Sequence, residues 1–321
     1  KAADDPLVLA IKITLYRVSK DSPIIEALMR AAENGKEVMT LVELKARFDE
    51  DNNIQWAKQL EQAGIHVVYG ILGFKTHTKI ALVVRKEKGR LRNYFHIGTG
   101  NYNSNTSRYY TDIGFLSTDP DISSDLIELF NYLSGFSKQK AYQKLLVSPT
   151  SLRKKFIFLI NREIENIEKG KKGEIIAKMN SLVDPEIIQL LYLASQKGVK
   201  IHLIIRGICC LYPQRENLSE NIKVTSIIGH FLEHSRIFWF YNNNNPEVFI
   251  GSADWMRRNL DRRIEAVTPI EDLKLKSQLY DLLQTYINDN YYSWIMNKDG
   301  IYEKKRGDSN SNRSQIDLIK D

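Results

Sequence analysis

The chain has 321 residues, of which 43% are hydrophobic and 26% are charged, and its formal net charge is +7. This length allows two globular domains of ordinary size, and the absence of any run of about 18 apolar residues argues against an integral membrane protein. The positive charge favours a polyanionic partner, although its sign does not distinguish among nucleic acid, an acidic membrane surface, nucleotides and inorganic phosphate chains.

Strand and helix signals alternate through residues 1–144, the first of two predicted domains. Residues 8–16 form an apolar, β-branched run that is typical of a buried strand. A helix is predicted next, with Ser22 and Pro23 at its beginning and Gly35 at its end. Further strands are predicted at 38–44, 66–69, 73–84 and 94–97, and further helices at 52–63 and 125–133.

His77 and Lys79 lie at the mouth of the predicted strand 73–84. Because alternate side chains of a strand share a face, both are expected to point into the same space. A nucleophilic imidazole beside a fixed cation suits attack on a phosphorus centre. The loop of small residues at 98–103 follows the next strand and can bring backbone N–H groups close to an anion.

The second predicted domain, residues 145–321, repeats these signals in the same order. A helix beginning at Pro185 feeds a strand at 199–205. His-Ser-Arg at 234–236 recurs in place of the earlier His-Thr-Lys, and Gly-Ser-Ala-Asp at 251–254 recurs in place of Gly-Thr-Gly-Asn. Two halves that each offer one histidine and one cation are predicted to face each other across a single pseudo-symmetric site. One imidazole would attack, while the other would donate a proton or hold the leaving oxygen.

The ends of the chain and its cysteines carry further expectations. The chain begins without a methionine, a signal or a transit segment, and we expect a longer protein in which the first domain is truncated on its N-terminal side. The polar residues from Lys304 to Asn312 predict a flexible C-terminal tail. Cys209 and Cys210 are adjacent, which suits neither an ordinary disulfide nor a metal site and favours a reducing, cytoplasmic location.

The paired motifs H-x-K…G-T-G-N and H-x-R…G-S-A-D resemble those of the phospholipase D superfamily. That resemblance implies an α/β fold of two similar domains, each a mixed β-sheet flanked by helices, which face one shared active site. This sequence departs from the superfamily pattern at Arg236, where lysine is usual, and at Asp254, where asparagine is usual. The aspartate that follows the lysine in the superfamily's hydrolases is also missing, so a plain phosphodiesterase is not the first expectation.

Longer motifs resemble a more specific family, polyphosphate kinase. They are ITLYR at 13–17, VELKARFD at 42–49, HIGTGNYN at 96–103, RGICC at 206–210, and SADWM at 252–256 followed by NLDRR at 259–263. The resemblance covers essentially the whole chain and corresponds to the two C-terminal catalytic domains of that family. It implies N-terminal domains ahead of this chain and a dimeric or tetrameric assembly. It also implies a location in the cytoplasm and at the inner face of the membrane.

The resemblance also implies roles for individual residues. His77 matches the histidine that is phosphorylated from ATP, and His234 matches the second catalytic, nucleotide-binding histidine. Arg17 and Arg47 match positions of the Mg²⁺ site, with Mg²⁺ as the expected cofactor. Because a guanidinium group has no lone pair for a cation, we expect these two arginines to hold phosphate oxygens that magnesium also coordinates.

Other residues complete the predicted site. Four residues are expected to contact ATP or phosphate: Tyr110, Arg206, Asn101 and Arg263. Lys79 is expected to be the electrostatic partner of His77. Those expected to orient a histidine or an arginine from behind are the carboxylates Glu43, Asp254 and Glu265.

The implied reaction is reversible transfer of the ATP γ-phosphate through His77 to the end of an inorganic polyphosphate chain. Net positive charge fits this polyanion, and polyphosphate has no bases, so no nucleic-acid partner is expected. Two alternatives stay open at this point. One is a phospholipase D-like phosphodiesterase or nuclease, and the other is a non-catalytic module that binds polyanions.

Overall fold

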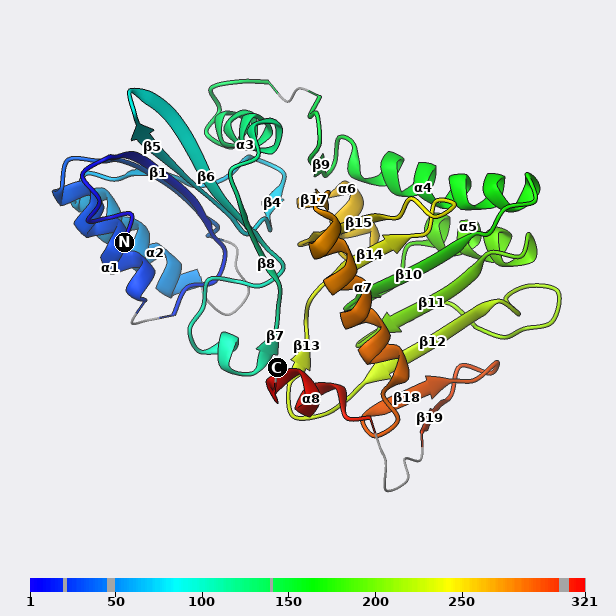
Figure 1. The fold of residues 1–321 in the computed structure, drawn as a ribbon. Coiled ribbons are helices and arrows are strands. Elements are labelled where there is room, and N and C mark those ends of the chain that lie inside the picture. Colours follow the sequence, from blue (N-terminus) through cyan, green and yellow to red (C-terminus); the bar gives the residue numbers. More distant parts are fainter. Residues whose placement is uncertain (20–21, 45–49, 139–140, 306–311, 321) are drawn as a thin grey trace.

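Two α/β halves lie side by side, each built on a β-sheet with helices on its faces (Figure 1). The computed structural model describes residues 1–19, 22–44, 50–138, 141–305 and 312–320. Within these ranges, no helix is long and apolar enough to cross a membrane.

The first sheet has six strands in the order β3-β2-β1-β5-β6-β8. β1, β2 and β3 run parallel, whereas β5, β6 and β8 are antiparallel to their neighbours. The strands are β1 (Val8–Leu15), β2 (Glu37–Val42), β3 (His66–Val68), β5 (Ile80–Glu87), β6 (Arg90–Gly98) and β8 (Gly114–Ser117). Helices connect the parallel strands because a parallel crossover needs a connection of this length.

The second sheet has nine strands in the order β19-β18-β12-β11-β10-β14-β15-β17-β9. Its strands are β9 (Leu146–Val147), β10 (Glu174–Met179), β11 (Lys200–Ile205), β12 (Ile222–Ile227), β14 (Ile237–Phe240), β15 (Glu247–Gly251), β17 (Ala266–Ile270), β18 (Ser293–Met296) and β19 (Tyr302–Lys304). Six of them, β12-β11-β10-β14-β15-β17, repeat the order and the strand directions of the first sheet. This confirms the internal duplication and the α/β fold class, while the exact boundary between residues 144 and 145 stays a prediction.

Helices pack on both faces of each sheet (Figure 1). In the first half, α1 and α2 cover one face and α3 covers the other, where it also packs against residues of the second half. In the second half, α4 and α5 cover one face and α7 covers the other. The helices are α1 (Pro23–Glu33), α2 (Glu50–Gln62), α3 (Pro120–Leu133), α4 (Leu152–Glu168), α5 (Pro185–Gln196), α6 (Arg257–Asp261), α7 (Leu273–Asn288), α8 (Ser314–Lys320) and the short 3₁₀ helix η1 (Thr106–Arg108).

Local sequence explains where several helices begin. Asp119 precedes α3 and Asp184 precedes α5, and each side chain accepts hydrogen bonds from backbone N–H groups of the first turn. Pro23 occupies the first position of α1, as predicted, although the Ser22 side chain makes no capping hydrogen bond. These local signals set where α1, α3 and α5 begin.

Two short parallel ladders join the halves, and each takes one strand from each half. β4 pairs with β16, and β7 pairs with β13. The strands are β4 (Lys75–Thr76), β7 (Tyr110–Thr111), β13 (Leu232–Glu233) and β16 (Arg263–Ile264). His77 directly follows β4 and His234 directly follows β13, so these ladders determine where both histidines stand.

The predicted strand at 73–84 is interrupted at its histidine. β4 and β5 flank a break at residues 77–79, which belong to neither strand. The backbone N–H of His77 donates to the Ile264 carbonyl at 2.8 Å, because β4 pairs with the other half whereas β5 belongs to the first sheet. The premise that His77 and Lys79 share the face of one strand is therefore wrong.

The flexible tail predicted at 304–312 stays a prediction, because residues 306–311 lie outside the described ranges. Beyond this segment, α8 is a docked helix whose first residues, Ser314 and Gln315, are buried. The backbone N–H and the hydroxyl of Ser314 both donate to the buried carboxylate of Asp289, at 2.8 and 2.6 Å. Polar residues hold this segment through hydrogen bonds, which an apolar periodicity does not reveal.

Candidate active site

One cavity of about 350 Å³ lies between the halves, and both His77 and His234 line it. Residues from the ends of β1, β4 and β7 form one side of the lining, and residues near β10, β11, β13 and β16 form the other. The two halves therefore face one shared site, as the duplicated motifs predicted.

His77 is held by a carboxylate from the other half. Its Nδ1 lies 2.9 Å from Oε2 of Glu265, which is fully buried between β16 and β17. The same carboxylate accepts hydrogen bonds from the Ser252 hydroxyl and from the side-chain amide of Asn259. These two donors stabilise the anionic form of the carboxylate, which can only accept, so Nδ1–H of the imidazole is the donor in this pair. Nε2 then carries the lone pair that a nucleophilic imidazole needs.

Burial and neighbouring charges keep His77 neutral. Burial lowers the pKa of His77 well below its usual value, and the charges of Lys79 and two arginines lower it further. Burial also raises the pKa of Glu265 to about 7, against the opposing effects of Lys79 and the hydrogen bonds. Because Ser252, Asn259 and the charge of Lys79 all favour the carboxylate form, we assign an anionic Glu265 and a neutral His77 at neutral pH.

Lys79 does not line the cavity, which corrects its expected orientation. Its side chain is only 1% exposed, and its ammonium group donates to the backbone carbonyl of His77. The ammonium also lies 5.0 Å from the centroid of the Tyr16 ring, and that ring packs edge-on against His77 at 4.8 Å between centroids. Burial lowers the pKa of Lys79 to about 7. Lys79 therefore acts on the histidine through its field and the backbone.

His234 has the matching arrangement with the halves reversed. Its Nδ1 lies 2.8 and 3.1 Å from the two carboxylate oxygens of Asp112, a residue of the first half. Asp112 also accepts a hydrogen bond from the Thr99 hydroxyl at 2.6 Å. Burial and then the charge of Arg236 lower the pKa of His234 to about 4, although Asp112 opposes the shift. Both histidines are thus neutral, and each is oriented by a carboxylate across the interface.

The sequence patterns did not identify Asp112. This residue follows β7 in the same way that Glu265 follows β16. Aligning Tyr-Thr-Asp at 110–112 with Arg-Ile-Glu at 263–265 reveals a further repeated landmark, in which the acidic residue differs by one methylene. That alignment is the signal that would have identified it.

The rest of the lining is strongly cationic. Six basic side chains line the cavity, against Asp254 as the single carboxylate among the described lining residues. Asp254 is already engaged, because its Oδ1 lies 3.2 Å from Nε of Arg236. The six are Arg17, Lys75, Arg206, Arg236, Arg258 and Arg263. Such a lining suits a ligand with several negative charges, and guanidinium groups match phosphate oxygens in geometry.

This donor set does not fit a magnesium ion bound directly by the protein. Magnesium prefers carboxylate and water oxygens, and the described part of the chain contains no cluster of three or more His, Cys, Asp or Glu residues that could hold a metal ion. Arg17, predicted for the magnesium site, lines the cavity but offers no lone pair. Arg47, the other residue predicted there, lies outside the described residues.

The other predicted residues take different positions. Tyr110, Asn101, Arg206 and Arg263 line the cavity, as do Lys75 and Arg258, which no motif had singled out. The centroid of the Tyr110 ring lies 5.0 Å from the centroid of the His234 ring. Glu43 accepts a hydrogen bond from the backbone N–H of Thr76 at 2.7 Å, so it holds β4 directly before the first histidine.

Solved structures with little sequence similarity share this fold. The structure of phosphatidylserine synthase from Haemophilus influenzae matches 97% of this chain and 87% of its own, with a TM-score of 0.60 and 11% identity. A mutant of yeast tyrosyl-DNA phosphodiesterase matches 84% of each chain, with a TM-score of 0.51 and 10% identity. At this identity the likeness concerns the fold alone. Together with two facing histidine motifs, it places the chain in the phospholipase D-like class.

Family models identify the branch of that class. Polyphosphate kinase C-terminal domain 1 matches residues 1–139, and C-terminal domain 2 matches residues 145–315. The polyphosphate kinase of Prochlorococcus marinus (strain MIT 9313) is 66% identical over 99% of this chain, which spans 45% of that relative. The crystal structure of polyphosphate kinase from Porphyromonas gingivalis matches 99% of this chain and 49% of its own, with a TM-score of 0.92 and 39% identity. The chain belongs to the polyphosphate kinase family.

Proposed function

We propose that this chain forms the catalytic site of an ATP:polyphosphate phosphotransferase, with ATP and inorganic polyphosphate as substrates. One observation carries the proposal: a single cavity holds a neutral histidine from each half among six basic side chains. Because the chain spans about half the length of the relatives it matches, the activity is proposed for the complete protein.

In the first step, Nε2 of His77 attacks the γ-phosphorus of ATP. The Nε2–phosphorus bond forms as the bond from phosphorus to the bridging oxygen breaks, and ADP leaves with the electron pair. The phosphorylated ring becomes cationic, and its Nδ1–H stays directed at Glu265, 2.9 Å away. The buried carboxylate therefore stabilises the positive charge that develops on the ring.

In the second step, a terminal oxygen of polyphosphate attacks the phosphorus of the phosphohistidine. The bond to Nε2 breaks, the imidazole of His77 returns to its neutral form, and the chain grows by one phosphate. The reverse sequence, with ADP as the acceptor, yields ATP. Both directions require only that the acceptor, polyphosphate or ADP, reaches the phosphorus in line with its bond to Nε2.

His234 is the proposed acid at the leaving oxygen. Its pKa of about 4 leaves Nε2 unprotonated near neutral pH, with Nδ1–H bound to Asp112. A bound triphosphate adds several negative charges beside the imidazole and offsets the charge of Arg236, which raises the pKa of His234. The proton at Nε2 is therefore gained when an anionic substrate is bound, which is when the leaving oxygen needs it.

The basic side chains are proposed to hold the phosphate oxygens. Phosphoryl transfer spreads charge over the equatorial oxygens, and fixed guanidinium groups stabilise that charge without reorganising. Magnesium is proposed to enter as part of the nucleotide complex rather than through protein ligands, because the lining supplies cations instead of carboxylates.

The test uses the complete protein and ATP labelled at the γ-phosphate. Acid-labile label is expected on His77 by peptide mapping, and it should move to polyphosphate when the acceptor is added. His77→Ala should carry no such label, whereas His66→Ala, a change at an exposed histidine, should label normally. Equal labelling of His77→Ala, or cleavage of a phosphodiester without ATP and without any labelled histidine, would overturn the proposal.

A further inference from the structure

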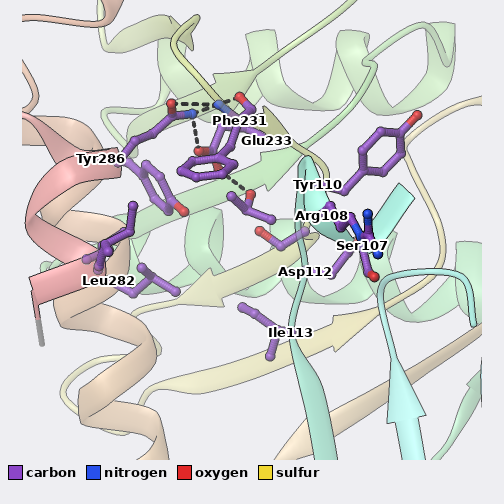
Figure 2. Close-up of a pocket in the computed structure, with 14 residues that line it drawn as sticks. Ser107, Arg108, Tyr110, Asp112, Ile113, Phe231, Glu233, Leu282 and Tyr286 are labelled. Carbon is purple, nitrogen blue, oxygen red and sulfur yellow. Dashed lines mark hydrogen bonds between the residues drawn. The ribbon is translucent and has the colours of Figure 1, made fainter. Parts of the chain in front are cut away.

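A second cavity, of about 330 Å³, lies behind the loop that carries His234 (Figure 2). Glu233 and Ser235 line it, whereas His234 between them lines the active-site cavity. Residues of α7 and α8, among them Tyr286 and Gln315, form its outer wall. The loop at 231–235 therefore separates the two cavities, and we call it the partition. His234 faces the active-site cavity, and α8 lies on the side of the second cavity.

Gln315 on α8 binds this partition from behind. Its side chain is buried, its Oε1 accepts a hydrogen bond from the Phe231 N–H at 3.0 Å, and its Nε2 donates to the Phe231 carbonyl at 2.8 Å. The same Nε2 donates to Oε1 of Glu233 at 2.7 Å. The side-chain amide thus pairs with the backbone as a neighbouring strand would, directly before β13.

Glu233 extends this contact to the rest of the site. Burial raises its pKa, but the charge of Lys178 and hydrogen bonds, including those from Thr111 and Gln315, outweigh that effect and hold the pKa below its usual value. The Lys178 ammonium lies 3.0 Å from Glu233 and 2.7 Å from the hydroxyl of Ser235. Loss of the Gln315 donor would leave this buried carboxylate one hydrogen bond short, next to His234.

The first histidine has a different support. The duplicated strand order places Thr76 where the second half has Glu233. The backbone N–H of Thr76 donates to Glu43, a residue of the same half. Gln315 contacts Phe231 and Glu233 beside His234, so a change at Gln315 should affect the two histidines unequally.

We propose that Gln315 is a positioning residue for His234 and that α8 thereby belongs to the working part of the site. It holds Phe231 and Glu233 so that the imidazole faces both Asp112 and the substrate phosphates. This inference rests on the proposed function, in which His234 protonates the leaving oxygen. The helix α8, which no sequence motif had singled out, thereby takes a role in catalysis.

The experiment replaces Gln315 in the complete protein. Gln315→Met keeps the side-chain length but removes the three hydrogen bonds, and kcat for ATP-dependent labelling of His77 should fall about tenfold while the KM for ATP changes by less than about twofold. Leu273→Ala, at an exposed position of α7 away from both cavities, is the control and should retain kcat. A kcat for Gln315→Met within twofold of the wild type, or an equal loss in Leu273→Ala, would overturn the inference.

A second variant supplies a readout that general loss of structure would not produce. Gln315→Glu places a carboxylic acid beside Glu233, and only its protonated form can donate the missing hydrogen bond. Activity relative to the wild type should therefore rise as the pH is lowered. A constant ratio across the pH range would contradict the proposal.

Imidazole ¹⁵N signals recorded without ATP separate this inference from the proposed function. In Gln315→Met the signals of His234 should shift while those of His77 stay in place, whether or not the protein makes polyphosphate. Equal shifts at both histidines, or none at either, would refute the positioning role. If Gln315→Met shows the selective shift but the wild type forms no labelled histidine with ATP, the result would count against the kinase assignment alone.

Discussion

The two halves of the molecule share the arrangement around their histidines and differ in what lies behind it. In both, Nδ1 of the histidine meets a carboxylate from the opposite half, Glu265 for His77 and Asp112 for His234. Behind His77 the Thr14 hydroxyl donates to the carbonyl of Thr78 at 2.9 Å. Behind His234 the equivalent position is Lys178, which forms an ionic cluster with Glu233 at 3.0 Å. Duplication thus preserved the histidine–carboxylate pair, while the supporting residues changed.

The cation of each motif shows the same divergence. Lys79 is buried under the first histidine, and its pKa of about 7 allows it to lose its charge. Arg236 lines the cavity and contacts Asp254 and the Thr99 carbonyl. A fixed charge suits contact with substrate phosphates, whereas a compact ammonium suits a dry position beside the nucleophile.

The largest expected effect separates the two histidines. His77→Gln should lower ATP-dependent labelling by at least about 10⁴-fold because the nucleophile is lost. His234→Gln should lower it by about 10²- to 10⁴-fold, the usual contribution of a general acid, while leaving slow labelling on His77. Single-turnover labelling measures both. Complete loss in His234→Gln with residual label in His77→Gln would reverse the assigned roles.

The supports behind the histidines should differ in their contribution to stability. Lys178→Met leaves the buried Glu233 without its cation, and the free energy of unfolding should fall by about 3–5 kcal/mol. Thr14→Val removes neutral hydrogen bonds only and should cost about 1–3 kcal/mol. Denaturant unfolding of both variants tests this order. Equal losses would mean that the ionic cluster adds nothing beyond the neutral pair.

Each carboxylate should matter to its own histidine. Glu265→Gln and Asp112→Asn place an amide beside Nδ1, which can favour the wrong tautomer, and each should slow labelling about 10- to 100-fold. The loss should be larger for Glu265→Gln because its partner is the nucleophile. Glu61→Gln, at an exposed carboxylate, serves as the control for charge removal. Normal rates in both variants would show that the carboxylates do not orient the rings.

The smallest expected effect concerns the titration of Lys79. Its pKa is lowered to about 7, so raising the pH from 6 to 8 removes most of its charge. Labelling of His77 should decline over this range by less than about tenfold, which corresponds to about 1.4 kcal/mol. Lys79→Arg keeps its charge and should flatten the profile if the protein folds. An unchanged decline in Lys79→Arg would assign the titration to another group.

The repeat itself was predictable from the sequence. Apolar runs with period two, amphipathic helices with prolines and aspartates at their beginnings, and the recurring histidine motifs are local features. They predicted the order of strands and helices, the duplicated α/β fold and the meeting of His77 with His234. The family membership also followed from short motifs along the chain.

Only the tertiary structure decided which groups act on each histidine. His77 and Glu265 are separated by 188 positions, and His234 and Asp112 by 122, so no local pattern connects them. Pairing of β4 with the other half also interrupted the predicted strand, and Lys79 became buried as a result. These contacts arise because each half contributes one short strand to each of the two ladders between the halves, and the packing of whole sheets brings those strands together.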